Sequence, residues 1–390
     1  FDLVIFDEAS QIKPEHSVGS IIRGNQLIVV GDEKQLPPTS FFSREMEIDD
    51  DDDVSLPSIL DECLTMPTCF KTSHLRWHYR SRDESLIQFS NLKFYDNKLY
   101  TFASQSRTTG HTGLEFNYIE NSVYDRGKSQ TNQKEADAIV DSLFKHYDTN
   151  PELSIGIVAL SVSQRRLIAD TLDDRLFKNP KYDKFVNNST SEEPLFIKNL
   201  ETVQGDQRDI IYISIAYGKD ANGKLYMSFG PLNKDGGERR LNVLVTRAKR
   251  KVVVFSSIKG SDFNLTQNSS YGAQLLKEYL EFAESGGQKD LRTSYDISGE
   301  LDVDNPFETS VAQQLTQANI KFVPQVGQSG YKIDFGIIDP SNPSKFLLAL
   351  ECDGASYHSS YTARDRDRIR QTVLEGLGWK FHRIWSTDWF

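Results

Sequence analysis

The sequence predicts an α/β protein whose parallel β-sheets are covered by helices, and two observations support this prediction. Short, continuously apolar runs recur along the 390 residues, and each ends in a polar cluster; they cover residues 3–6, 27–30, 155–160, 210–214 and 252–255. Helix-period stretches lie between them, at 133–147 and 163–177. Strands of this kind that alternate with helices are typical of parallel sheets buried on both faces. Such sheets bind ligands at the carboxyl ends of their strands, which is where the polar clusters lie.

The composition is that of an ordinary globular chain with an acidic surplus. Hydrophobic residues make up 38% and charged residues 26%, with a formal net charge of -11. No run approaches the roughly 18 apolar residues that a membrane span requires, so we expect no membrane partner and a cytoplasmic location. Three cysteines cannot make a disulfide framework and fit a reducing compartment. The net charge excludes a wholly basic nucleic-acid coat but permits a basic groove.

Two shifts in composition indicate the domain organisation. The chain opens with Phe1 and an apolar strand, which predicts a piece of a longer protein. Residues 257–299 are rich in Ser and Gly around a predicted helix at 272–284, and we interpret them as a connector. A third unit follows, with helices at 306–319 and 364–377 and strands at 333–338, 346–351 and 380–384.

Two carboxylates follow the first strand directly. Adjacent acids such as Asp7 and Glu8 suit nucleoside triphosphate hydrolysis, in which one holds Mg²⁺ and the next orients the attacking water. Alone, such a pair is usually a solvated strand end. The second strand, however, ends in the segment GDEKQLPP from Gly31 to Pro38. Its glycine permits a sharp turn, from which Gln35 can reach a phosphate or its water.

Three more clusters follow in a recognisable order. They are LRWHYR at 75–80, ETVQGD at 201–206 and LNVLVTRA at 241–248. Together with the two preceding segments, they resemble motifs II to VI of superfamily 1 helicases, in the subgroup of the up-frameshift and DNA-replication helicase-nucleases. The resemblance covers residues 1–257, and it implies two RecA-like P-loop NTPase domains that clamp one ATP. The first, at 1–110, is partial, and the second spans 111–260.

The resemblance also implies roles for single residues of the first motifs. Asp7 would hold Mg²⁺, Glu8 would be the general base, and Gln35 would sense the γ-phosphate. Arg80 and Arg247 would act as arginine fingers that stabilise charge in the transition state. The alternative for each arginine is a surface ion pair.

The fifth motif implies coupling between the nucleotide and the nucleic-acid track. Gln204 and Gly205 would carry that coupling. Family members often have Glu two positions after this glycine, where the chain has Gln207. The chain therefore departs from the family pattern at the position that would contact the ribose.

The sequence contains no phosphate-binding loop of the form G-x-x-x-x-G-K-[ST] before motif II, which is the Asp7-Glu8 pair. The nearest imitation is Gly127-Lys128-Ser129, but Ser122 stands where the first glycine is required. We interpret that segment as a loop. We therefore expect ATP hydrolysis by the full-length protein and negligible hydrolysis by these 390 residues.

The third unit, at 301–390, carries separate acidic residues. Asp334 lies in one predicted strand, and Glu351 and Asp353 end the next. Residues two apart in a strand share a face, so Glu351 and Asp353 are predicted to point the same way. Converging carboxylates can hold Mg²⁺ or Mn²⁺ and activate water against a phosphodiester. The alternative is a buried structural acid cluster, which is costly without neutralising partners.

This pattern resembles the restriction-endonuclease-like, PD-(D/E)XK fold, in its very-short-patch-repair-like branch. The resemblance adds Glu308 on the preceding helix as the first acid, and His358 as general base or leaving-group helper. The usual lysine two residues after the second acid is Asp353 here. A degenerate nuclease that only binds is therefore an open alternative.

Arginines and tryptophans of the third unit admit two interpretations each. The arginines of the segment RDRDRIR at 364–370 either hold phosphates or pair with the interleaved aspartates. The tryptophans at 379, 385 and 389 are predicted to fill a core rather than to stack bases.

The sequence as a whole predicts the C-terminal portion of an ATP-dependent helicase fused to a metal-dependent endonuclease, acting in DNA processing, repair or defence. The appended nuclease favours DNA over RNA. The alternatives are a non-enzymatic DNA-binding fragment and an RNA helicase motor.

Overall fold

The computed structural model describes residues 1–38, 57–103, 105, 113–188, 191–287, 306–327, 332–343, 345–353 and 361–389, and it describes the side chains of 361–367 no further. Contacts divide the chain into two compact units. The first comprises Phe1–Leu75, Phe116–Arg247 and Val253–Glu281. The second comprises Arg76–Glu115, Ala248–Val252 and Phe282–Phe390.

The first residues form a small parallel sheet of two strands. Strand β1 (Val4–Phe6) pairs with β2 (Leu27–Val29), and helix α1 (Pro14–Ile21) forms the crossover between them. Helix α2 (Ile59–Leu64) packs against this layer through a core that includes Ala9. Its N-terminus is fixed by a capping box, in which the Ser58 hydroxyl accepts from the Asp61 N–H and the Asp61 carboxylate accepts from the Ser58 N–H.

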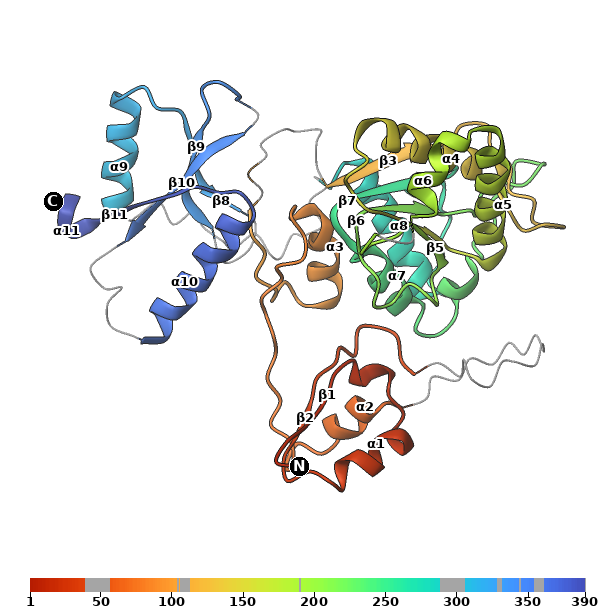
Figure 1. The fold of residues 1–390 in the computed structure, drawn as a ribbon, viewed down its shortest axis with the longest axis horizontal. Helices are drawn as coiled ribbons and strands as arrows, with labels where there is room; N and C mark the ends of the chain where they lie inside the picture. The colour runs from red at the N-terminus through yellow and green to blue at the C-terminus, as the bar shows by residue number, and fades with distance from the viewer. Residues whose placement is uncertain are drawn as a thin grey trace. The chain divides into compact units, whose positions relative to one another are not determined.

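A five-stranded sheet follows, in the order β3-β7-β6-β4-β5 (Figure 1). Its strands are β3 (Leu114–Tyr118), β4 (Ile155–Ala159), β5 (Phe196–Asn199), β6 (Arg208–Ser214) and β7 (Ala248–Ser256). Strand β4 is parallel to both of its neighbours. The helices that accompany the sheet are α4 (Gln133–Thr149), α5 (Val162–Lys178), α6 (Asp183–Val186), α7 (Gly237–Val245) and α8 (Tyr271–Glu284). Short 3₁₀ turns lie at Ala9–Gln11, Pro180–Tyr182, Gly230–Asn233 and Gly260–Asp262.

The core of this sheet forms where α4 and α5 cover one face. Ile139 of α4, Ile168 of α5 and Ile157 of β4 are all fully buried within it. Both helices start with a side-chain cap, because Asn132 accepts from the Glu135 N–H and Ser161 accepts from the Gln164 N–H.

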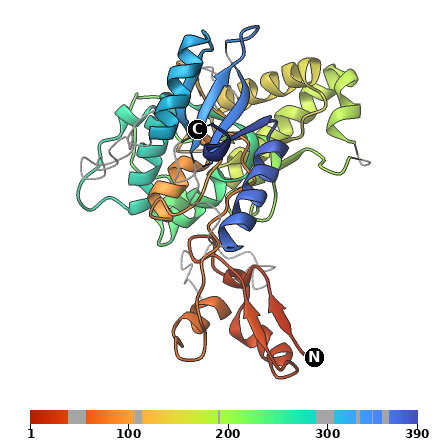
Figure 2. The ribbon, with the colours of Figure 1, turned by 90° about the vertical axis from the view of Figure 1, so that its left-hand side faces the viewer.

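The second unit contains helix α3 (Ser85–Phe94) and a four-stranded sheet in the order β11-β10-β9-β8. Its strands are β8 (Phe322–Val326), β9 (Ile333–Ile338), β10 (Phe346–Asp353) and β11 (Phe381–Trp385). Strand β9 is antiparallel to β8 and β10, whereas β10 and β11 are parallel. Helices α9 (Pro306–Gln317) and α10 (Tyr361–Gly376) pack on opposite faces of this sheet, and α11 (Ser386–Trp389) ends the described chain (Figure 2).

The stretch just after α3 belongs to the core of the C-terminal sheet. Phe102 and Ala103 pack with Trp379, whose indole N–H donates to the Ala103 carbonyl at 2.8 Å. Gln105 and Phe346 exchange hydrogen bonds at 3.0 Å. The contacts of Trp379 and Phe346 thus tie residues 102–105 to the third predicted unit. The domain boundaries predicted near residues 110, 260 and 300 stay a prediction.

The predicted α/β class is confirmed, and a strand or helix of the predicted type lies at each of the thirteen ranges that the apolar and helix-period patterns predicted. Trp379 is 2% exposed and stacks on Phe346, in agreement with a core role, and Trp389 packs edge-on against Phe307. Within the described residues, no helix combines the length and the apolar character that crossing a bilayer requires.

Candidate nucleotide and nuclease sites

The backbone at the end of β1 presents the two predicted catalytic carboxylates to solvent. Glu8 has φ 51°, ψ 38°, a left-handed conformation that is uncommon for a residue with a side chain. The Asp7 carboxylate accepts the Glu8 N–H at 2.9 Å, and Gln11 Nε2 donates to Glu8 Oε2 at 3.1 Å. Both acids are exposed, and the described residues provide neither with a basic partner. The pair is therefore available to a cationic ligand.

The loop after β2 lies against the same strand end. A Cβ on Gly31 would come within 2.9 Å of the Ser10 N atom, so only glycine permits this close approach. Asp32 then organises the turn, because its carboxylate accepts from the Lys34 N–H at 2.9 Å and from Gln35 Nε2 at 3.0 Å. The Gln35 side chain is held in a defined position.

Two further predicted motifs, V and VI, contact this loop within the first unit. Gln204 Nε2 donates to Gln35 Oε1 at 3.5 Å, and Asn242 Nδ2 donates to the Lys34 carbonyl at 2.9 Å. Gly205 follows with φ +86°, a value that favours glycine. Gln204 Oε1 is buried and has no hydrogen-bond partner among the described residues. A buried acceptor without a donor is costly, so a donor from a ligand would relieve it.

The predicted finger Arg247 lies just after α7 and is 4% exposed. Its Nε donates to the Val243 carbonyl at 2.8 Å and its Nη2 to Thr246 Oγ1 at 3.0 Å. On the same helix, Arg240 pairs with Glu201 of the fifth motif at 2.7 Å. Arg80 belongs to the second unit. The structure thus joins motifs III, V and VI, and Arg247 is held against its own helix end.

The described residues fit the hydrolytic half of a magnesium–ATP site. The exposed Asp7 and Glu8 carboxylates offer hard oxygen donors, and the unpartnered Gln204 oxygen lies beside Gln35. The predicted loop at Gly127–Ser129 is a turn, in which the Asp125 carboxylate accepts the Ser129 N–H and hydroxyl. It therefore does not cradle a phosphate as a helix N-terminus would.

In the second unit, the predicted acids of β9 and β10 lie on neighbouring antiparallel strands. The Asp334 carboxylate accepts the Cys352 N–H at 2.7 Å across the pair. On α9, Glu308 accepts from Gln325 Nε2 at 3.1 Å. The predicted base, His358, lies outside the described residues.

Glu351 and Asp353 each face a guanidinium that the sequence did not point to. Arg370 of α10 lies 3.0 Å from Glu351 Oε1 through Nη2 and donates to Oε2 at 3.3 Å through Nη1. It also donates to the Lys332 carbonyl at 2.6 Å. Arg383 of β11 pairs with Asp353 at 3.1 Å. Both pairs are largely buried, so their charges are weakly screened.

Burial dominates the electrostatics of this cluster. It raises the pKa of Asp334 to about 6, although the Cys352 N–H opposes the shift. It raises the pKa of Glu351 to about 7, although Arg370 opposes the shift. It also raises the pKa of the Cys352 thiol to about 12. The two arginines therefore compensate the acidic cluster only in part.

The cluster does not fit a bound divalent cation as its described side chains are arranged. Within the described part of the chain, no three His, Cys, Asp or Glu residues are placed to hold a metal ion. Guanidinium groups lie against Glu351 and Asp353, where a metal would supply its charge. A cation would first have to displace at least one of them.

Sequence reasoning missed Asn242, Arg370 and Arg383 as site residues. Asn242 lies in the motif LNVLVTRA, in which the motif pattern assigns a role only to Arg247. Arg370 lies in a predicted helix whose arginines could hold phosphates or pair with neighbouring aspartates. Arg383 had no local signal in the sequence. It lies in the strand that pairs in register with Glu351 and Asp353.

Fold and sites together define a class of protein, a helicase-type ATPase segment joined to a restriction-endonuclease-like domain. A family model described as an AAA domain (AAA_12) matches residues 58–259, just over half of the 390 residues, and the chain belongs to this family. A second model, REase_MTES_1575, matches residues 307–390. The superfamily 1 helicase with a restriction-endonuclease-like domain, predicted from the motifs, is confirmed.

Three curated relatives illustrate the range of this family. An ATP-dependent helicase of Mycoplasma pneumoniae is 29% identical over 413 residues, which cover 100% of this chain and 35% of that protein. The DNA replication ATP-dependent helicase/nuclease of Saccharomyces cerevisiae is 26% identical, over 66% of this chain and 17% of its own length. A regulator of nonsense transcripts 1 homolog of Neurospora crassa is 26% identical, over 66% and 23%. The chain thus spans about a third of the first relative and less of the others.

Proposed function

We propose that the full-length protein is an ATP-dependent helicase or translocase, and that this chain supplies its hydrolytic acids and its coupling residues. The observation that carries the proposal is the contact of Gln35 with Gln204 and of Lys34 with Asn242. These contacts join the loop beside the acids to the second RecA-like sheet, so a change at the nucleotide can reach both.

In the proposed mechanism, Asp7 would hold Mg²⁺, which would neutralise phosphate charge. Glu8 accepts a proton from the attacking water, for which its exposed carboxylate and its fixed backbone suit it. Gln35, held by Asp32, orients that water or a γ-phosphate oxygen. Gln204 offers its unpartnered oxygen to the same region and changes partner with the nucleotide state.

Arg247 acts as an arginine finger in this proposal. Its bonds to Val243 and Thr246 hold the guanidinium at the end of α7. Planar guanidinium groups bind phosphoryl oxygens in a bidentate manner, which lysine cannot reproduce. Arg80 is proposed as the second finger, as the motif order implies.

We propose DNA as the polymer, because a restriction-endonuclease-like domain shares the chain. An RNA motor is the alternative. The test is ATP turnover by the full-length protein with single-stranded DNA or RNA of one sequence. Stronger stimulation by DNA supports the proposal, whereas stimulation by RNA alone refutes the choice of polymer.

Phosphodiester cleavage is the second candidate function, favoured by the cluster of Asp334, Glu351 and Asp353 and by the match of residues 307–390. The sequence predicts that Mg²⁺ or Mn²⁺ is required. The pairing of two of these acids with arginines favours the degenerate, binding-only alternative. A nicking assay on supercoiled plasmid, with each metal, separates them. Cleavage that is lost in Asp334→Asn supports the nuclease, and no cleavage by the wild type supports the binding domain.

A further inference from the structure

A cavity of about 220 Å³ opens at one edge of the five-stranded sheet, in the first unit. Ser161 enters its wall directly after β4, and Tyr217 and Gly218 enter it after β6. Because β4 and β6 are parallel, both segments emerge at the same edge, where sheets of this kind bind ligands. None of the residues assigned above to the nucleotide site lines this cavity.

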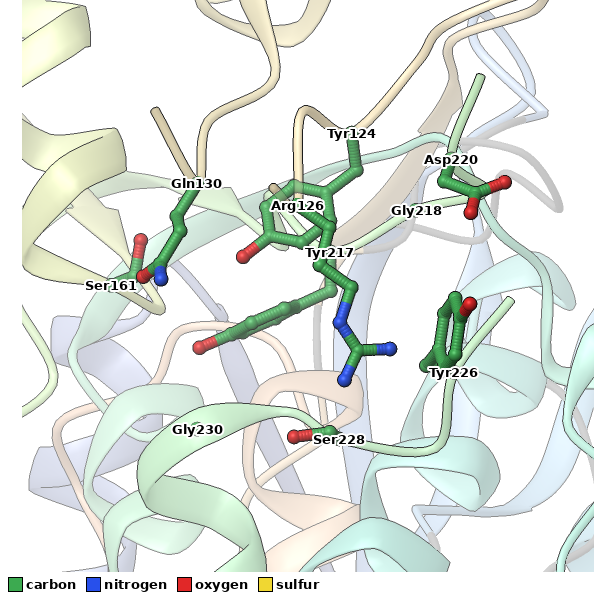
Figure 3. A pocket seen from close by; sticks show the side chains of 10 residues that line it. All are labelled: Tyr124, Arg126, Gln130, Ser161, Tyr217, Gly218, Asp220, Tyr226, Ser228 and Gly230. Atoms are coloured by element: carbon green, nitrogen blue, oxygen red, sulfur yellow. The ribbon is translucent and has the colours of Figure 1, made fainter. Parts of the chain in front are cut away.

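A single guanidinium dominates the interior. Figure 3 shows the Arg126 side chain extending between the rings of Tyr217 and Tyr226. Its guanidinium carbon lies 3.7 Å from the centroid of the Tyr226 ring, a close cation–π contact. Among the described residues, Arg126 has no carboxylate partner. Stacking occupies a face of the guanidinium and leaves its N–H edges available for an anion.

The aromatic wall is already formed. Tyr124 and Tyr217 are buried, and their ring centroids are 5.4 Å apart. Burial raises the pKa of both phenols, so their hydroxyls stay neutral at physiological pH. Gly230 touches the Tyr217 hydroxyl so closely that no side chain would fit there. The two rings are therefore held in place by the packing around them.

Neutral and acidic groups complete the lining. Ser161, Ser228 and Gln130 offer donors and acceptors, and the Ser161 oxygen also caps α5. Asp220 offers a carboxylate at the other side (Figure 3). One cation, aromatic faces and several hydroxyls suit a phosphate together with a base. The volume is below the roughly 300–1,000 Å³ of pockets for drug-sized ligands, which favours one unit of a longer chain.

We propose that this cavity holds one nucleotide of a single strand, with its phosphate on Arg126 and its base against the tyrosine wall. The proposal rests on the proposed function, because it assigns part of the nucleic-acid track of that motor. Base stacking on aromatic rings is tolerant of sequence, as a translocating motor requires.

The test measures binding of a labelled single-stranded oligonucleotide to the full-length protein by fluorescence anisotropy, across a range of salt concentrations. Arg126→Ala should weaken binding about 10-fold. It should also make the decline of the logarithm of the association constant with the logarithm of salt concentration less steep, by about 0.7. Arg126→Lys should keep the slope but not the affinity, because lysine lacks the planar stacking face. Lys128→Ala, at an exposed cation of the same loop that lies outside the cavity, is the matched control.

Equal effects of Arg126→Ala and Lys128→Ala on affinity and slope would overturn the proposal, since only general charge would then be at work. The proposal would also be overturned if Arg126→Ala lost binding of a fluorescent adenosine monophosphate but kept the wild-type affinity for the strand. The cavity would then be a site for free nucleotides. The melting temperature of each variant checks its folding. If the wild type shows no strand-stimulated ATP turnover, the proposed function itself fails, whatever Arg126 does.

Discussion

Substituting Asp334 by asparagine should make the C-terminal unit more stable at high pH. A folded-state pKa of about 6, against the ordinary 3.8, means that ionisation of this buried carboxyl opposes folding by about 3 kcal/mol. Asparagine keeps the shape and an oxygen that can accept the Cys352 N–H, but it carries no charge. The gain is an upper value, because the new amide N–H₂ also needs a partner.

The sign and the pH window follow from the raised pKa. The wild-type carboxyl contributes stability in full below pH 3.8 and loses it as the pH rises through 6. The advantage of Asp334→Asn should therefore be about 3 kcal/mol at pH 8 and about 1 kcal/mol at pH 4.5.

Urea unfolding followed by tryptophan fluorescence measures this directly, because all four tryptophans, at positions 77, 379, 385 and 389, lie in the second unit. Asp339→Asn is the control, since that carboxyl is exposed and hydrogen bonds from Ser341 lower its pKa. It should give no gain at pH 8. An Asp334→Asn protein that is no more stable than the wild type at pH 8, or whose advantage does not change with pH, would show that ionisation of Asp334 does not oppose folding.

Three further predictions follow from the described contacts. Arg247→Ala in the full-length protein should lower kcat about 10³-fold, and Arg247→Lys should not restore kcat, both measured by steady-state ATP turnover. Unchanged turnover in Arg247→Ala would make Arg247 a structural residue. Arg370→Ala should destabilise the second unit by about 3–5 kcal/mol in the same urea assay, because it leaves Glu351 buried without its partner. The control Arg368→Ala, at an exposed arginine of the same helix, should change the free energy of unfolding little. Iodoacetamide should label the exposed Cys69 and spare the buried Cys352 in the native protein, as measured by mass spectrometry. Equal labelling of both thiols would contradict the burial that raises the pKa of Cys352.

The fold was predictable wherever one local pattern dominated. The strand predicted at 333–338 matches β9 residue for residue, and the helix predicted at 133–147 extends only two residues further, to Thr149. The strands β3, β5 and β8 were missed, because none is a continuous apolar run. Glu115 and Asn117 alternate with apolar residues in β3, Lys198 and Asn199 end β5, and Pro324 interrupts β8. Strands of this kind are specified by their neighbours in the sheet and not by their own sequence.

The candidate sites were predictable as residue types but not as networks. Glu351 and Asp353 could be placed on one face of a strand from their spacing alone. Their partners could not, because Arg370 comes from a helix and Arg383 from a strand whose positions depend on the packing of the whole sheet. The contact of Gln204 with Gln35 joins residues 169 positions apart, so no local pattern announces it.

If the acids after β1 catalyse ATP hydrolysis, turnover must depend on the Glu8 carboxylate. Single-strand-stimulated ATP turnover is compared among the full-length wild type, Glu8→Gln and Glu15→Gln, the last at an exposed acid of α1. Glu8→Gln should lose turnover by at least about 10²-fold, the usual contribution of a general base, while Glu15→Gln should stay at the wild-type rate. Wild-type turnover in Glu8→Gln would contradict this role of the Glu8 carboxylate.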